Sequence, residues 1–390
     1  MPAMPAHRIE YLGISETQLA ARGALRTARE IEQQPRMLER TRALVAGMHD
    51  RLQRFVAPVT DTAAARVILA GAGSSAYIGQ CLAPVLDRQL AARVDAVPTT
   101  DLVSAPDLYL DPRHPLLMVS FGRSGNSPES LAAVELVEAC VPKSRHLVVT
   151  CNADGALGRI QVKDSLTLQL PEETHDAGFA MTSSFSCMLY ATLAALSPAH
   201  ALDARIQPMT SATAAVIDDA WPALQALADQ RHDRVAYLGS GLLQGLAREA
   251  ALKLGELCNG TVATCFDSPL GFRHGPKTFV TSNTLVVVFV SNNPLTRSYD
   301  HDLVDELRHD GVAARVIEVT AQPRSGATDD TIVVPGMAQA DDVDLVWPYV
   351  AAAQVFALQA SLARGIMPDN PNPQGMVNRV VQGVRIHAAA

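Results

Sequence analysis

The chain has 390 residues, of which 48% are hydrophobic and 18% are charged, and its formal net charge is −8. This length allows two domains that each bury a core, and the low charged fraction argues against long disordered segments. The negative net charge argues against a broad surface for nucleic acid or for an anionic membrane, because phosphates attract clustered Lys and Arg.

The N-terminus and the cysteines predict a cytoplasmic protein. The first residues lack the basic and apolar regions of a signal peptide, and apolar runs such as Leu285 to Val290 are far shorter than the roughly 20 residues of a membrane span. The six cysteines form no C-x-x-C pair and have no His at metal-ligand spacing. We therefore expect reduced thiols, with no disulfide framework, no metal site and no cofactor.

Helical patterns come first along the chain. Residues 16–55 are rich in Ala, Leu, Arg, Glu and Gln, with apolar residues near helical spacing, which predicts two or three helices before the first strand. A structural cap or a dimer arm accounts for this segment better than a DNA-binding helix-turn-helix. A second helical segment, 210–230, predicts the connection between two strand-rich regions.

An internal repeat sets the expected architecture. RVILAGAGSSAYIGQCLAPVL from Arg66 matches RVAYLGSGLLQGLAREAALKL from Arg234, and the next two strand patterns, from Pro115 and His146, match those from Leu285 and Ala314. Apolar strands that alternate with helices predict parallel sheets buried on both faces. We predict an α/β protein with two tandem doubly wound domains, divided as residues 1–55 (helical extension), 56–209 and 210–390.

Serine-rich turns follow two strands of the first repeat. Ser74 and Ser75 come after the glycine turn at Gly71, and Ser120, Ser124 and Ser127 belong to the next strand and its turn. The first turn lacks the third glycine of a dinucleotide fingerprint, and no Walker pattern is present. Hydroxyls and free N–H groups at helix N-termini suit a phosphate monoester, whereas ordinary N-caps explain one serine per turn. A third polar turn, Thr182 to Ser184, is placed to close the same pocket.

The second repeat has acids and bases where the first has serines. Glu249, Lys253 and Glu256 lie at i, i+4 and i+7 and project from one face of a helix. Just downstream, His274 lies between Arg273 and a Gly-Pro turn. A solvated salt-bridged stripe and an incidental loop His are the ordinary interpretations, but together these residues are also candidates for acid/base catalysis.

The motifs GAGSSAYIG, SFGRSGNSPES, EAALKLGEL and FRHGPK resemble those of the sugar isomerase (SIS) domain, here as a tandem pair. The chain is similar to the isomerase half of glucosamine-6-phosphate synthase. Over nearly its whole length it is more similar to the tagatose-6-phosphate ketose/aldose isomerase family, whose members include galactosamine-6-phosphate deaminases. TAREIEQQPRML, ETHDAGFAMTSSFSCM and PDNPNPQGMVNRVVQGV carry this closer resemblance.

The resemblance implies roles for individual residues. It implies that Glu256 is the base between C1 and C2, flanked by Glu249 and Lys253, and that His274 opens the sugar ring, in the synthase from the neighbouring subunit. We therefore expect self-association as a homodimer or larger assembly. The implied substrate-binding residues are Ser74, Ser75, Ser120, Arg123, Ser124, Ser127, Thr182, Ser183 and Gln382.

Two positions depart from the synthase. Gly122 replaces a phosphate-loop serine, and Gln382 replaces a C-terminal lysine, so a lysine Schiff base is not supported.

The sequence thus predicts conversion of galactosamine 6-phosphate to tagatose 6-phosphate and ammonia through an open-chain enolamine. Two alternatives stay open. One is aldose/ketose isomerisation without deamination, which shares the first steps. The other is a sugar-phosphate sensor without catalysis, which would not need to retain Glu256 and His274.

Overall fold

The structure is a computed structural model that describes residues 10–325, 329–381 and 383–387. Its described residues form two five-stranded parallel sheets and a short N-terminal hairpin. The hairpin pairs β1 (Glu10–Tyr11) with β2 (Ile14–Ser15). The strands of the first sheet are β3 (Arg66–Ala70), β4 (Arg93–Ala96), β5 (Leu116–Gly122), β6 (Ser144–Thr150) and β7 (Ser165–Gln169). Those of the second are β8 (Arg234–Gly239), β9 (Ala263–Asp267), β10 (Thr284–Phe289), β11 (Arg315–Thr320) and β12 (Thr331–Val333).

The two sheets repeat one topology. The first has the order β4-β3-β5-β6-β7 and the second the order β12-β11-β10-β8-β9, so both follow the 2-1-3-4-5 order of a doubly wound fold. The glycine turns repeat as well: Gly73 and Gly241 both have φ of +57°, a left-handed conformation that favours glycine. The predicted fold class and internal repeat are confirmed.

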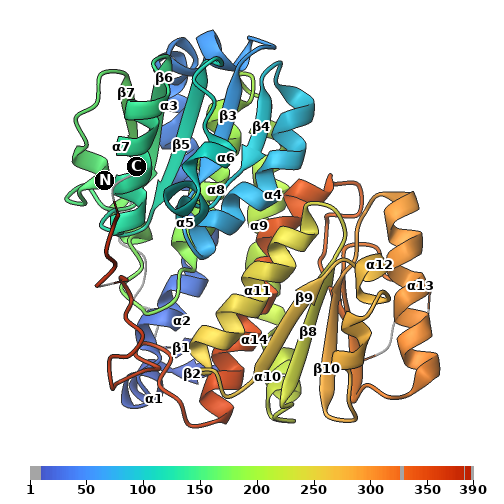
Figure 1. Ribbon diagram of the computed structural model, residues 1–390. Coiled ribbons are helices and arrows are strands. Elements are labelled where there is room, and N and C mark those ends of the chain that lie inside the picture. The colour runs from blue at the N-terminus through green and yellow to red at the C-terminus, as the bar shows by residue number, and fades with distance from the viewer. Residues whose placement is uncertain (1–9, 326–328, 382, 388–390) are drawn as a thin grey trace.

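Helices cover both faces of each sheet (Figure 1). In and beside the first domain they are α1 (Glu16–Ala21), α2 (Leu25–Glu32), α3 (Gln34–Thr60), α4 (Ser74–Gln89), α5 (Thr99–Ser104), α6 (Pro106–Tyr109), α7 (Pro128–Cys140) and α8 (Ser183–Leu196). Two helices, α9 (Asp203–Asp219) and α10 (Trp221–Ala228), make the predicted connection. The second domain has α11 (Leu243–Leu257), α12 (Pro269–Phe272), α13 (Pro294–Asp310) and α14 (Asp342–Ala363).

Helices α1–α3 match the predicted N-terminal helical segment, and α3 runs on to Thr60. The proposed boundaries at 55/56 and 209/210 fall inside α3 and α9, so that division of the chain stays a prediction.

A single large core joins the two domains. It combines the inner faces of both sheets with α3, α4, α8, α11 and α14, whereas a smaller cluster fills the outer face of each sheet. Helix α4 of the first domain packs on α11 and α14 of the second. The helices between the sheets thus hold the two domains together through buried apolar surface.

Helix α14 differs from the expectation that the apolar runs of this chain are far too short to span a membrane. It is long and apolar enough to cross a membrane, but its apolar segment is entirely buried inside the protein. Its polar groups bond inward: Trp347 Nε1 donates to the Ser186 carbonyl at 3.0 Å, and Ser361 Oγ donates to the Leu257 carbonyl at 2.7 Å. The run was missed because Gln354, Gln359 and Ser361 interrupt it.

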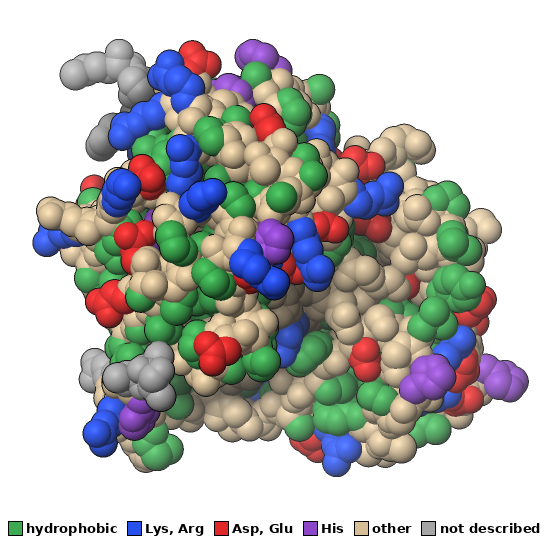
Figure 2. Space-filling model, turned by 45° about the horizontal axis from the view of Figure 1, so that its top comes forward, with side chains coloured by type: hydrophobic (Ala, Val, Ile, Leu, Met, Phe, Trp, Pro, Cys, Tyr) green, Lys and Arg blue, Asp and Glu red, His purple; other side chains and the backbone are tan. Residues whose placement is uncertain are grey.

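Acidic and basic side chains are interspersed over the face of the molecule in Figure 2, so that face carries no broad basic surface.

Substitution in α14 tests the shared core. Leu358 is fully buried, so L358A should lower the free energy of unfolding by about 2–5 kcal/mol through lost burial and a cavity. The control L108A, at a side chain that is 78% exposed, should change it by less than about 0.5 kcal/mol. Urea denaturation followed by circular dichroism measures both, and equal midpoints for the two variants would contradict the assignment of α14 to the core.

Candidate functional site

The two serine turns lie side by side at the carboxyl edge of the first sheet. Strands β3 and β5 are neighbours, and α4 and α7 leave the sheet from them. This is the point where the strand order reverses, and ligands of doubly wound folds bind there. Gly71 makes the approach possible, because a Cβ at this residue would lie 2.5 Å from Cβ of Ser75.

A cavity of about 240 Å³ opens at this edge. Its walls come from both turns, from the segment before α8, from α11 and from the C-terminal segment. Its lining residues are 72–75, 121–125, Ser127, Ser130, Phe179, Met181, Glu256 and 377–381. Of the residues predicted from the sequence, it brings together Ser74, Ser75, Arg123, Ser124, Ser127 and Glu256.

The hydroxyls of the two turns have different partners. Ser74 Oγ donates to Glu249 Oε1 at 3.1 Å, and Ser127 Oγ donates to Glu129 Oε2 at 2.6 Å. Ser75 Oγ lies 3.8 Å from the Met181 sulfur, a weak acceptor, and Ser124 Oγ accepts the Asn126 N–H at 3.3 Å. The N-terminal ends of α4 and α7 add partial positive charge at the cavity, a setting that favours an anion.

Gly122 fits this turn for a steric reason. A Cβ at residue 122 would lie 3.0 Å from Leu157 Cδ2 and 3.1 Å from Gly125 Cα. A serine here would require the neighbouring backbone to shift. The departure from the synthase is thus matched by close packing around Gly122.

A chain of charges on α11, buried except at Glu256, reaches the first domain through the hydrogen bond from Ser74 to Glu249. Lys253 and Glu249 are both fully buried, with Lys253 Nζ 3.6 Å from Glu249 Oε1, and Lys253 also forms an ion pair with Glu256. Burial raises the pKa of Glu249 to about 7, although the Lys253 charge and the Ser74 hydrogen bond act in the opposite direction. For Lys253, burial disfavours the charge, but the carboxylates of Glu249 and Glu256 prevail and raise its pKa. The three residues are thus one network and not a solvated stripe.

Glu256 is the member of this network that faces the cavity. It also lines a second hollow of about 610 Å³ that runs along α11 and contains Tyr77, Arg248 and Phe266. Arg248 stacks over both rings, at 5.2 Å from the Tyr77 centroid and 4.8 Å from the Phe266 centroid. Glu256 therefore stands between the serine turns on one side and an open space on the other.

Three of the predicted substrate-binding residues, Ser120, Thr182 and Ser183, do not line the cavity at the serine turns. Ser183 Oγ donates to Asp176 Oδ1 at 2.5 Å, and neither Thr182 nor Ser183 lines the cavity. Asp176 also accepts the main-chain N–H groups of Thr182 and Ser184, at 2.8 and 2.9 Å, and so caps α8 from six residues upstream. Ser120 is buried within β5 and does not line the cavity.

The remaining predicted residues lie elsewhere. His274 follows α12, is exposed and lines neither hollow beside Glu256. Gln382 lies outside the described residues.

Arg123 holds the wall of the cavity together. Its Nη1 donates to the Phe179 carbonyl at 2.9 Å, and its Nη2 donates to the Arg379 carbonyl at 2.7 Å. Arg123 therefore holds the segment before α8 and the C-terminal segment against the serine turn that follows β5. The predicted place of Arg123 near the substrate is compatible with this geometry.

Glu30 of α2 supports the same wall from behind. Its Oε1 accepts the N–H groups of Ala177 and Gly178 at 2.6 and 2.9 Å. Gly178 permits this approach, because a Cβ there would lie 2.7 Å from Glu30 Oε2. Burial, with the charge of Asp176, raises the pKa of Glu30 to about 8. No local sequence pattern marks Glu30, because its contacts join residues almost 150 positions apart.

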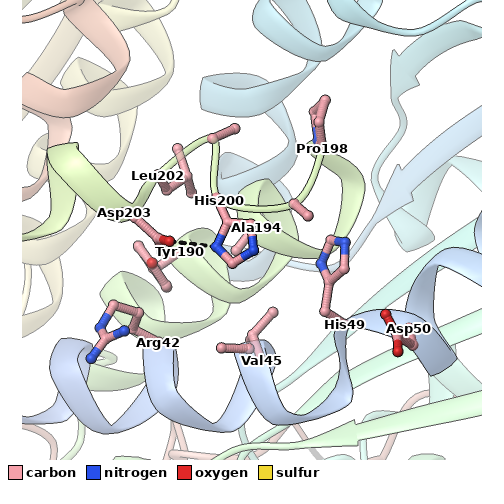
Figure 3. Close-up of a pocket in the computed structure, with 13 residues that line it drawn as sticks. Arg42, Val45, His49, Asp50, Tyr190, Ala194, Pro198, His200, Leu202 and Asp203 are labelled. Atoms are coloured by element: carbon pink, nitrogen blue, oxygen red, sulfur yellow. Dashed lines mark hydrogen bonds and ion pairs between the residues drawn. The ribbon is translucent and has the colours of Figure 1, made fainter.

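Another cavity, of about 200 Å³, lies between α3, α8 and the loop after α8 (Figure 3). His200 Nδ1 lies 2.6 Å from Asp203 Oδ2, and Arg42 pairs with Glu39 at 3.2 Å. This cavity has no glycine–serine turn and no residue of the buried network. The cavity at the serine turns is therefore the candidate active site.

The chain is similar to known proteins in both sequence and structure. The SIS domain family model matches residues 62–198. D-galactosamine-6-phosphate deaminase AgaS from Escherichia coli O157:H7 is 45% identical, over 95% of this chain and 98% of its own. The crystal structure of tagatose-6-phosphate ketose/aldose isomerase from Escherichia coli has a TM-score of 0.85 and 42% identity, covering 93% of this chain and 96% of its own.

A more distant structure shares the fold. The C-terminal domain of glucosamine-fructose-6-phosphate aminotransferase from Francisella tularensis has a TM-score of 0.73 at 15% identity, covering 88% of this chain and 98% of its own.

The pH dependence of stability tests the role of Glu30. The raised pKa means that its stabilising contribution is present below about pH 4.5 and is lost as the pH rises through about 8. E30Q lacks this titration, so wild type should lose stability relative to E30Q over this range, by up to roughly a few kcal/mol. Denaturant unfolding of both proteins at several pH values measures the difference. A difference between wild type and E30Q that does not change with pH would contradict this role, and E135Q, a substitution of an exposed glutamate, is the matched control.

Proposed function

The chain belongs to the AgaS family of tandem SIS-domain proteins, and from this premise we propose that it is a D-galactosamine-6-phosphate deaminase. The observation that carries the proposal is the position of Glu256. It lines the same cavity as Ser75, Ser124 and Ser127, although the serines belong to the first domain and Glu256 to the second. A proton-transfer group thus faces a site suited to a phosphate monoester.

The proposed reaction keeps the sugar phosphate anchored while the proton moves. The serine turns and the N-termini of α4 and α7 hold the 6-phosphate. Glu256 takes the proton from C2 of the open-chain amino sugar and delivers a proton to C1, which gives a ketose imine. Water then hydrolyses the imine to tagatose 6-phosphate and ammonia.

The buried network suits Glu256 to this task. Lys253 is fully buried beside Glu256 and fixes its carboxylate, and Lys253 is fixed in turn by Glu249. Side chains held in this way satisfy the positioning that general acid/base catalysis needs. Glu249 and Lys253 act through Glu256 and are positioning residues in this mechanism.

Plain aldose/ketose isomerisation is the second candidate, and the name of the Escherichia coli structure supports it. The two reactions share Glu256 and the phosphate site and differ in whether the group at C2 is an amine. Only the release of ammonia separates them. The sensor alternative is disfavoured by the enzymatic activities for which the relatives are named.

Assays with the purified protein test the function. Galactosamine 6-phosphate should yield equal amounts of ammonia and tagatose 6-phosphate. E256Q should lower kcat by about 10²- to 10⁴-fold, because the general base is lost, while substrate still raises the melting temperature. No ammonia from galactosamine 6-phosphate would refute deamination, and E256Q activity within tenfold of wild type would refute Glu256 as the base.

We further propose that the protein self-associates and that the partner's His274 completes the site. His274 is exposed and lies outside the cavity of its own chain, whereas Glu256 borders a second hollow large enough to admit a loop. A histidine is suited to ring opening because its ordinary pKa lies near neutrality. The predicted role of His274 therefore requires a second copy of the chain.

Mixing of inactive variants tests this arrangement. E256Q and H274A should each be nearly inactive, and a mixture that has exchanged subunits should regain activity, because one site of the mixed dimer has both residues intact. Light scattering should show a mass above that of one chain, and wild type serves as the reference for full activity. A mixture that stays inactive after exchange is demonstrated would place His274 outside the partner's site.

A further inference from the structure

The C-terminal segment forms part of the candidate active site. Residues 377–381 line the cavity together with the serine turns, and in Figure 1 the dark red tail runs from α14 back along the first domain. Asn372 starts the return, since its Nδ2 donates to Asn259 Oδ1 at 3.2 Å and its Oδ1 accepts the Met376 N–H at 3.2 Å. The segment is therefore anchored to the second domain before it reaches the first.

Arg379 lines this cavity, and its guanidinium lies close enough to Arg123 for the two charges to interact. Its side chain donates to the main-chain carbonyl of Asp176, while its own carbonyl accepts from Arg123 at 2.7 Å. The buried Nε of Arg379 has no hydrogen-bond partner within the described residues. Both guanidiniums thus bond to carbonyl oxygens and not to carboxylates.

Positive charge exceeds negative charge around Arg123 and Arg379. Burial lowers the pKa of Arg379, and the neighbouring charge of Arg123 lowers it further, against the nearby Glu30 and Asp176. Because burial and Asp176 raise the pKa of Glu30 to about 8, Glu30 is mostly neutral at pH 7 and offsets little of this positive charge. Asp176, which caps α8, is the other carboxylate near Arg379. The carboxylate that lines the cavity, Glu256, is paired with Lys253. Two like charges held together cost free energy that an anion between them would offset.

We propose that Arg379 is a substrate-binding residue that, with Arg123, balances the charge of the phosphate dianion. This inference rests on the proposed function for the identity of the sugar. A phosphate monoester carries close to two negative charges at neutral pH, which two guanidiniums match. Guanidinium forks also bind phosphate oxygens in pairs, and the serines supply neutral hydrogen bonds.

The pair explains how an acidic protein captures an anion. The net charge of −8 gives no long-range attraction for a sugar phosphate. Attraction must therefore come from groups inside the cavity, where water does not screen them fully. Because Arg379 lies on the returning C-terminal segment, phosphate binding also stabilises that segment against the first domain.

Binding of inorganic phosphate, measured by isothermal titration calorimetry, tests the proposal without the chemical reaction. R379M should weaken phosphate binding by about 10- to 100-fold and raise KM for galactosamine 6-phosphate to a similar degree, with a much smaller change in kcat. R379K keeps the charge but loses the fork and should fall between R379M and wild type. R385M removes an exposed arginine of the same tail and is the matched control, expected to bind as wild type does.

Three outcomes would overturn the proposal, and a fourth would refute the proposed function alone. One is R379M that binds phosphate as tightly as wild type, including when its melting temperature falls, since that assigns Arg379 a structural role alone. If R379M does not fold, R379K with wild-type affinity and wild-type KM has the same meaning. Wild type that binds phosphate but releases no ammonia refutes the deaminase function and leaves the test of Arg379 intact. Wild type that binds no phosphate at millimolar concentration refutes the anion site itself.

Discussion

The site depends on one buried ionic network, Glu249–Lys253–Glu256, that joins α11 of the second domain to α4 of the first. Lys253 is fully buried, so its charge persists only because two carboxylates lie beside it. Ser74 Oγ, at the first residue of α4, donates to Glu249 across the domain interface. The same hydrogen bond that stabilises the buried acid thus also joins the two domains at the site.

The two halves of the repeat contribute different chemical groups to the site. Both domains have the same strand order and the same glycine turn, yet the first keeps hydroxyls at that turn and the second has leucines. The first domain therefore offers dipoles to an anion, and the second offers the carboxylate that faces it. Either half alone has an incomplete site, and the large common core of α4, α11 and α14 keeps the halves in place.

The fold, the serine turns and the charged face of α11 could be predicted from the sequence, because each depends on a local pattern of residues. Apolar strands, glycine turns and the i, i+4, i+7 spacing of Glu249, Lys253 and Glu256 specify the fold, the serine turns and the face of α11. Long-range contacts could not be predicted in the same way. Asp176 uses the hydroxyl of Ser183 that the sequence assigns to substrate, and Glu30 reaches Gly178 from a helix early in the chain.

The position of the C-terminal segment also depends on long-range contacts. The resemblance assigns a role there to Gln382, which lies outside the described residues, and among the described residues of the segment 377–381 line the cavity. No periodicity marks this segment, since its position depends on hydrogen bonds to Asn259 and Arg123. The roles of His274 and Gln382 stay predictions.

The most direct measurement is a crystal structure of E256Q with galactosamine 6-phosphate bound. We expect the phosphate between the turns at residues 74–75 and 124–127, with C2 of the sugar about 3–3.5 Å from the side chain of residue 256. A phosphate bound elsewhere, or residue 256 on the far side of the sugar from C2, would contradict this expectation.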